Sequence, residues 1–259
     1  MTSLCIVIPC KYSEEHGYMV FNCVASIKRT YPEAKVYVVD SDSDDTTYLD
    51  KLESDYSVVG LRVKNKNYST GALWKVYDLT KGKYDNYLLL HDSTMFKTGD
   101  CVDDKIDGLL LKKYKVAPIT YYTKWQWPTS SAGHRSSKWP KKVLGQNSMN
   151  TDCGFVSLLG PMFMVESGVL EEIKQTKFYN IRPSNKYQSE CMERLWGFIF
   201  SDLGYAKNLE QNSLLAPNIS ATKNKAMIKD LRKDDFFHKC KTHITTETDS
   251  IQKFWISRK

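Results

Sequence analysis

The chain has 259 residues, of which 41% are hydrophobic and 26% are charged, and its formal net charge is +7. This length and composition suit one large globular domain or two small ones. No apolar run approaches the roughly 20 residues that a membrane-spanning helix needs, and the opening residues "MTSLCIVIPC" lack the basic region of a signal peptide. We therefore expect a soluble protein with no transmembrane segment.

The net charge indicates the kind of partner, and the cysteines indicate the cellular compartment. A mildly positive chain favours anionic partners such as nucleotides, although a solvated lysine-rich surface explains the same excess. The lysines are scattered rather than clustered, so no nucleic-acid partner is expected. The seven cysteines include no C-x-x-C pair, and several lie within apolar runs. Reduced thiols in a cytoplasmic protein fit this pattern.

The first 95 residues alternate between short apolar runs and amphipathic segments. The spacing predicts strands over 4–9, 36–39, 57–65 and 85–92, and helices over 14–32, 46–56 and 69–82. This alternation predicts an α/β fold with a mostly parallel central sheet flanked by helices. Ligands of such sheets bind at the carboxyl ends of the strands.

The second half has a different texture. A loop over 123–152 is rich in Trp, Ser and basic residues, and loops of this length are usually functional or disordered. The other predicted elements are a helix over 100–115, strand-like texture over 153–167, helices over 168–176 and 189–205, and a basic tail from residue 221.

Polar residues follow three of the four strands predicted in the first half. These are Pro9, Cys10 and Lys11, then Asp40, Ser41 and Asp42, then His91, Asp92 and Ser93. Because the carboxyl ends of parallel strands share one sheet edge, we expect these residues to meet there. Asp40 can accept hydrogen bonds from a ribose hydroxyl or a base N–H. The alternative is an acidic turn that caps the next helix.

Asp92 and Glu193 are the carboxylates best placed for chemistry. Asp92 ends the buried run "LLLHD", and a carboxylate there suits Mg²⁺ or Mn²⁺ bound together with substrate phosphates. Capping of the following turn is the alternative. Glu193 shares a helix face with Glu190 at the edge of an apolar stripe. Such a glutamate can act as a general base, whereas an ion pair with Arg194 would make it structural.

Six segments, in order along the chain, resemble motifs of the GT-A glycosyltransferases, especially those of family 2. They are "IVIPCKYSEE", "VYVVDSDSDDTT", "NYSTGALWKV", "YDNYLLLHDST", "GPMFMVESGVLEEI" and "CMERLWGFIFSDLGY", and the resemblance spans residues 4–205. The fourth stands where the family has its metal-binding D-x-D, and the last resembles the helix that carries the catalytic acid. Small Lys- and Tyr-rich chains of this kind also resemble enzymes of large DNA viruses and of bacterial polysaccharide clusters. A viral source would place the protein in the host cytoplasm.

The resemblance implies one catalytic domain over 1–259 with the GT-A fold, a Rossmann-like nucleotide-diphospho-sugar transferase fold. Its nucleotide-sugar-binding half would span 1–99, its acceptor-binding half 100–220, and 221–259 would form a C-terminal extension packed on the domain. The implied activity is a metal-dependent glycosyl transfer in glycan biosynthesis. A nucleotide-sugar, with UDP favoured, would give its sugar to a glycan or glycoprotein hydroxyl with inversion.

The implied roles fall on specific residues. Mn²⁺ or Mg²⁺ would be bound by Asp92 and His238, and Glu193 or Asp152 would be the catalytic base. The donor would be held by Pro9, Lys11, Asp40, Asp42, Asn67, Gly71, Lys75 and His91, and the acceptor by Trp125, Trp127 and Arg135. Two departures bear on these roles. Asp92 is the only carboxylate at the D-x-D position, and Met192 replaces the first member of the family's acidic pair.

Two other functions are weighed against the transferase. The degenerate D-x-D also fits a non-catalytic nucleotide- or sugar-binding module derived from such an enzyme. A nucleotidyltransferase that makes the activated sugar would need a glycine-rich phosphate loop after the first strand, where only Gly17 is present. The tryptophans of the long loop, among them Trp139, can alternatively act as hydrophobic anchors.

Overall fold

The computed structural model describes residues 3–81, 83–96, 115–118, 121–125, 139–140, 142–144, 155–158, 161–205 and 251–253. Its main sheet has six strands in the order β3-β2-β1-β4-β9-β6. They are β1 Leu4–Cys10, β2 Lys35–Asp40, β3 Val59–Leu61, β4 Asn86–Leu89, β6 Val116–Pro118 and β9 Phe163–Glu166. The first four strands run parallel, and β9 is antiparallel to both of its neighbours.

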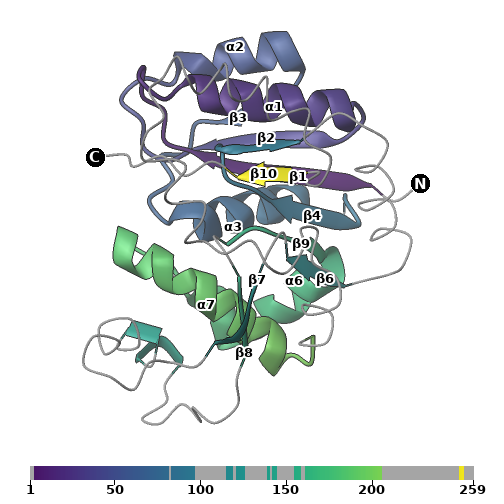
Figure 1. Ribbon diagram of the computed structural model, residues 1–259, viewed down its shortest axis with the longest axis vertical. Helices are drawn as coiled ribbons and strands as arrows, with labels where there is room; N and C mark the ends of the chain where they lie inside the picture. Colours follow the sequence, from purple (N-terminus) through teal and green to yellow (C-terminus); the bar gives the residue numbers. More distant parts are fainter. Residues whose placement is uncertain are drawn as a thin grey trace.

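Helices cover both faces of this sheet. Figure 1 shows α1 and α2 on one side and α3, α6 and α7 on the other. The helices are α1 Tyr18–Thr30, α2 Thr47–Tyr56, α3 Tyr68–Thr80, α6 Ser167–Lys174 and α7 Lys186–Asp202, with a 3-10 turn η1 over Lys177–Asn180. The prediction of an α/β fold with a mostly parallel central sheet flanked by helices is confirmed.

The central strands are apolar on both faces because both faces are covered. Along β1, Cys5 and Val7 belong to the core under α3, α6 and α7, whereas Ile6 and Ile8 belong to the core under α1 and α2. All four side chains are fully buried. This placement explains why the run "LCIVI" has no alternation of polar and apolar residues.

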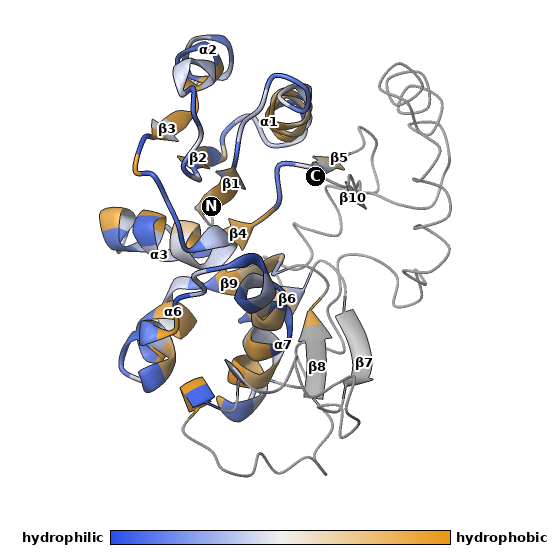
Figure 2. Ribbon diagram, turned by 90° about the vertical axis from the view of Figure 1, so that its left-hand side faces the viewer, coloured by the Kyte–Doolittle hydropathy of each residue, from blue (hydrophilic) through white to orange (hydrophobic). Residues whose placement is uncertain are grey.

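Two small antiparallel sheets complete the described part of the chain. β7 Tyr121–Trp125 pairs with β8 Phe155–Leu158, and β5 Thr94–Phe96 pairs with β10 Ile251–Lys253. β5 packs on α1, where the Phe96 N–H donates to Ser26 Oγ at 3.1 Å. The pairing with β10 means that a segment near the C-terminus returns to the strand that follows Asp92. Figure 2 shows the chain passing from β4 to β5.

The structure also corrects some predicted elements. The loop prediction over 123–152 is wrong at its start, because β7 extends to Trp125. The strand-like stretch over 153–167 contains two strands, β8 and β9. The helix predicted over 100–115 falls almost wholly outside the described residues. Among the described helices, none combines the length and the hydropathy needed to cross a membrane.

Candidate functional site

The carboxyl ends of β2, β1 and β4 lie side by side, as the sequence predicts. Cys10 is the register partner of Asp40, and the Ser41 N–H donates to the Cys10 carbonyl at 2.8 Å. On the other side of β1, Val7 is the partner of Leu89, and the Leu90 N–H donates to the Val7 carbonyl at 3.0 Å. The polar residues that follow these three strands therefore share one edge, which we call the donor edge.

Asp40 is fully buried at this edge, and its carboxylate is bonded within the chain. Oδ2 accepts the backbone N–H groups of Asp42 at 3.1 Å and Ser43 at 3.2 Å, and Oδ1 accepts the Tyr48 hydroxyl at 3.2 Å. Burial, with Cys10 and Asp40 nearby, raises the pKa of Tyr48, so its hydroxyl stays protonated as the donor. These bonds assign Asp40 to the β2–α2 turn, and a direct contact to a donor remains a prediction.

Tyr12 and Tyr48 were not singled out from the sequence. Their rings stack with centroids 4.5 Å apart, and the Tyr12 N–H donates to Ser43 Oγ at 2.8 Å. Tyr12 is half-buried and Tyr48 is buried, so Tyr12 is the part-exposed ring of the pair, beside the ends of β1 and β2. We call this stacked pair the tyrosine wall, because an aromatic ring at such a place can contact a base or a sugar ring.

Three predicted donor-binding residues lie beside this wall. Lys11 is exposed, whereas Asp42 and Pro9 are half-buried. Asp42 has a positive φ of 63° and lies 3.7 Å from Lys66 Nζ. A non-glycine residue in this backbone region is uncommon and often belongs to a functional turn. These positions agree with the predicted edge, and their contacts with a donor remain predictions.

Asn65 organises the loop that leads into α3. Its side chain is buried, its Nδ2 donates to the Tyr68 carbonyl at 2.7 Å, and its Oδ1 accepts the Asn67 N–H at 3.1 Å. Its own N–H donates to the Asp40 carbonyl at 2.9 Å. The sequence prediction named Asn67 and Gly71 from this segment, but the buried asparagine that makes these bonds is Asn65.

The first turn of α3 contacts both the donor edge and α7. Ser69 Oγ lies 3.3 Å from His91 Nε2, within hydrogen-bond distance. The next residue, Thr70, accepts the indole N–H of Trp196 at 3.2 Å. Two adjacent side chains of one helical turn therefore connect the "HDST" segment after β4 to α7.

Asp92 is buried in the turn between β4 and β5, where the Thr94 N–H donates to the His91 carbonyl at 3.1 Å. Within the described residues, no group of three or more His, Cys, Asp or Glu side chains is arranged to hold a metal ion. Mg²⁺ is commonly bound by one or two carboxylates, with phosphates and water as its other ligands. The role of Asp92 as the single carboxylate of such a site stays a prediction, and His238 lies outside the described residues.

Glu193 is half-buried on α7, three residues before Trp196 and so on the same side of the helix. The chain just before α7 is also held at α3, because Asn67 Nδ2 donates to the Pro183 carbonyl at 3.0 Å. Arg194 donates from Nη1 to the Glu190 carbonyl at 3.3 Å. The segment that carries Glu193 therefore lies along the first turn of α3.

The other predicted site residues fall on other elements or outside the described residues. Lys75 is exposed in the middle of α3, six residues from Ser69, which corresponds to about 9 Å along the helix axis. Trp125 lies in β7. Trp139 is half-buried against the core, which confirms its alternative role as an anchor. The remaining predicted residues, Trp127, Arg135 and Asp152, lie outside the described residues.

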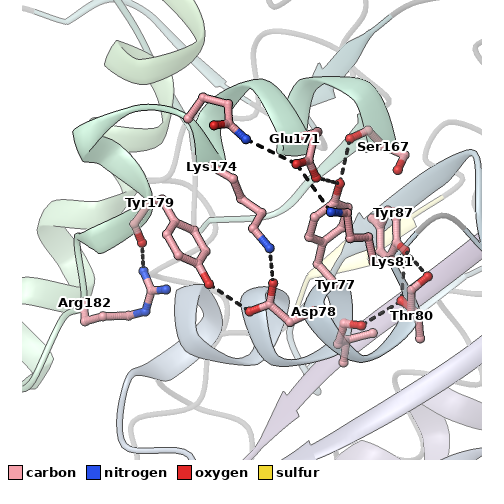
Figure 3. Close-up of polar contacts among 12 residues, drawn as sticks. Tyr77, Asp78, Thr80, Lys81, Tyr87, Ser167, Glu171, Lys174, Tyr179 and Arg182 are labelled. Atoms are coloured by element: carbon pink, nitrogen blue, oxygen red, sulfur yellow. Dashed lines mark hydrogen bonds and ion pairs between the residues drawn. The ribbon is translucent and has the colours of Figure 1, made fainter.

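A polar cluster on α3, α6 and η1 is structural. Figure 3 shows Asp78 accepting from Lys174 Nζ at 2.6 Å and from the Tyr179 hydroxyl at 2.9 Å. Tyr77 donates to Glu171 at 3.0 Å, and burial raises the pKa of Tyr77 to about 12. The charges of this cluster are paired with one another, and they hold α3 against α6.

The comparisons with known proteins concern the fold. No protein-family profile matches the chain, and no curated protein matches it. Among solved structures, a CMP-2-keto-3-deoxy-manno-octonic acid synthetase complexed with CTP is 15% identical with a TM-score of 0.46, over 79% of this chain and 87% of that one. A 4-diphosphocytidyl-2C-methyl-D-erythritol synthase from Anaerococcus prevotii is 11% identical with a TM-score of 0.47, over 74% of this chain and 83% of that one.

A third similar structure is core-mannan synthase A from Aspergillus fumigatus in its Mn/GDP form. It is 7% identical with a TM-score of 0.42, over 77% of this chain and 66% of that one. Identities and scores this low give no information about the reaction of this chain.

Proposed function

We propose that the protein is a glycosyltransferase that moves a sugar from a nucleotide-diphospho-sugar to a hydroxyl acceptor at the donor edge. The observation that carries this proposal is the first turn of α3, which contacts His91 beside Asp92 and also contacts α7, the helix of Glu193. A carboxylate suited to a phosphate-bound metal and a carboxylate suited to act as a base are thereby held by one structural element.

The donor would lie across the ends of β2, β1 and β4. Its nucleoside would contact the tyrosine wall, Pro9 and Asp42, and its diphosphate would lie towards Lys11, His91 and Asp92. Helix α3 begins at this edge, and the amide groups of a helix N-terminus favour negative charge. Asp40 would act through the turn that presents Asp42 and Ser43.

Asp92 would hold Mn²⁺ or Mg²⁺ together with phosphate oxygens of the donor. A divalent ion bound there would offset the negative charge that builds on the leaving nucleoside diphosphate. The absence of a second carboxylate at the D-x-D position predicts weak metal binding until the nucleotide supplies its own ligands.

Glu193 would be the general base. In a single displacement, the acceptor oxygen forms a bond to the anomeric carbon as the bond from that carbon to the diphosphate oxygen breaks. The proton of the acceptor hydroxyl passes to the Glu193 carboxylate, and the configuration at the anomeric carbon is inverted. The acceptor contacts of Trp125, Trp127 and Arg135, the second base candidate Asp152 and the metal ligand His238 stay predictions, as does a cytoplasmic role in glycan synthesis.

Thermal melting with UDP-, GDP-, TDP- and CMP-sugars, each with and without Mn²⁺, tests the proposal. We expect a UDP-, GDP- or TDP-sugar to raise Tm with Mn²⁺ and its sugar to be released or transferred, with the nucleoside diphosphate as the product. A response to the CMP-sugar alone, with CMP as the product, would contradict a diphosphate donor. A Tm shift without turnover, across many acceptor types, would favour the binding module. Pyrophosphate release from a nucleoside triphosphate and a sugar phosphate would identify a nucleotidyltransferase. No shift with any nucleotide would contradict the proposal.

A further inference from the structure

We propose that Thr70 is a positioning residue that sets where Glu193 stands relative to the bound donor. The inference rests on the proposed function, in which Glu193 is the base. Thr70 does not touch the reacting atoms in this account. It acts through Trp196, which lies on α7 with Glu193.

The contact between Thr70 and Trp196 is deeply buried. Trp196 Nε1 donates to Thr70 Oγ1 at 3.2 Å, and each residue is only 1% exposed. The indole is surrounded by aromatic rings with centroids 4.9 to 6.1 Å away, namely Trp74, Phe163 and Phe200. Aromatic rings offer no oxygen to an indole N–H, and buried N–H groups in proteins almost always have an acceptor. The bond from Trp196 to the Thr70 hydroxyl therefore joins α7 to the first turn of α3 inside the core.

Glu193 lies on the helix that this bond holds. Residues three apart on a helix are neighbours on its surface, so Glu193 is one turn before Trp196, the α7 residue that bonds α3. The chain before α7 is tied to the same region by the bond from Asn67 to the Pro183 carbonyl at 3.0 Å. The segment that carries Glu193 is thus held at two points to the start of α3.

The donor edge is held by the neighbouring residue. Ser69 lies 3.3 Å from His91, and His91 directly precedes Asp92. Loss of the Thr70 bond would let α7 shift while the bond between Ser69 and His91 remains. The consequence is specific: the chemical step should slow because the base is misplaced, and donor affinity should stay close to its original value.

Thr70→Val tests this because valine keeps the shape of threonine and removes the acceptor. We expect kcat to fall by about 10- to 100-fold, a range typical of displacement of a catalytic group by about 1 Å. The donor Kd, measured by calorimetry, should change less than about threefold, within the scatter of a mutation with no effect on binding. Thr70→Ser keeps the hydroxyl and should restore most of kcat.

Thr80→Val is the matched control. Thr80 is also a buried threonine of α3, and its hydroxyl lies 2.9 Å from the Tyr87 hydroxyl, at the opposite end of the helix. Both Thr80→Val and Thr70→Val remove a buried hydroxyl and should lower Tm, but Thr80→Val should leave kcat unchanged. An equal fall of kcat in both variants would mean that general destabilisation, and not positioning, is responsible.

The decisive measurement is the double variant with Glu193→Gln. If Thr70 acts through Glu193, then Thr70→Val should cause no further loss of kcat in the Glu193→Gln background. A full additional loss there would overturn the inference. If Thr70→Val folds poorly, Trp196→Phe removes the donor from the other side, and it should show the same fall of kcat and the same non-additivity.

Failure of the inference and failure of the proposed function give different results. Transfer undiminished by Glu193→Gln would remove Glu193 as the base, and the inference would fall with it. Transfer lost in Glu193→Gln but normal in Thr70→Val and in Trp196→Phe would overturn the inference alone.

Discussion

The side-chain oxygen of Asn65 occupies the space in which any residue other than glycine at position 71 would place its Cβ. A Cβ on Gly71 would lie 2.4 Å from Asn65 Oδ1 and 2.5 Å from Asn67 Cβ. Asn65 in turn bonds Tyr68, which has a positive φ of 54° and begins α3. The missing side chain of Gly71 therefore lets the buried asparagine shape the helix start that meets the donor edge.

Gly71→Ala should therefore destabilise the protein by about 1–3 kcal/mol, the usual cost of overpacking a tight site. Urea unfolding measures the effect. Gly168→Ala is the control, because a Cβ on Gly168 meets nothing within 4 Å and its position in α6 tolerates alanine. The control should be neutral or stabilising by up to about 1 kcal/mol. Equal stability of the two variants would contradict the described packing of Asn65.

Tyr48→Phe should cost about 1–3 kcal/mol of stability, because the buried Asp40 carboxylate loses a hydrogen-bond donor. Tyr12→Phe keeps the ring that stacks on Tyr48 and serves as the comparison. Urea unfolding of both variants measures the two changes in stability. If Tyr48→Phe is as stable as the wild type, the assignment of Asp40 to the β2–α2 turn loses its support.

Asp92→Asn should remove the part of donor binding that depends on metal. In the wild type, the nucleotide should raise Tm by more when Mn²⁺ is present than when it is absent. Addition of EDTA should remove this difference. In Asp92→Asn the gain should be the same with and without Mn²⁺, because an amide is a poor ligand for the ion compared with a carboxylate. Asp45→Asn is the control on the same sheet edge.

The carboxylate of Asp45 bonds the N–H and the hydroxyl of Thr47, each at 2.8 Å, at the start of α2. These bonds lower the pKa of Asp45, so its contribution to stability is present at neutral pH and is lost as pH falls through the lowered pKa. Asp45→Asn should remove that acid-side dependence and leave the Mn²⁺ effect intact. An undiminished Mn²⁺ effect in Asp92→Asn would exclude Asp92 as the ligand.

Gln252→Pro should weaken donor binding although residue 252 is far from Asp92 in the sequence. Gln252 is the register partner of Met95 in the middle of the pairing of β10 with β5, where proline is disfavoured. β5 begins two residues after Asp92, so its loosening should lower Tm and weaken Mn²⁺-dependent nucleotide binding. Gln252→Val, which suits a strand, should leave both unchanged. Unaltered binding in the proline variant would show that β10 does not support the Asp92 turn.

The predictable part of this fold is the part in which local pattern and burial agree. The central strands β1 and β4 are buried on both faces, so "LCIVI" and "YLLL" are continuous apolar runs, and the helices between the strands show regular spacing. Asp40 and Asp92 were predicted to share one edge because parallel strands end together, and the register of β2, β1 and β4 agrees.

The rest depends on contacts between distant residues. β5 and β10 have three residues each and pair across most of the chain, so neither has a periodic signal of its own. The importance of Asn65 arises from the left-handed backbone at Tyr68 and from the space at Gly71. The bond between Thr70 and Trp196 joins residues 126 positions apart, so no local pattern predicts it.

The most direct test of the central claim is Glu193→Gln, measured both for donor binding and for turnover. The proposed chemistry predicts that the nucleotide-sugar binds with unchanged affinity in the presence of Mn²⁺. It also predicts that transfer falls by about 100- to 10,000-fold, the usual contribution of a general base. Glu190→Gln, an exposed glutamate one turn earlier on α7, is the control and should keep its transfer rate. Transfer by Glu193→Gln at the wild-type rate would contradict the account.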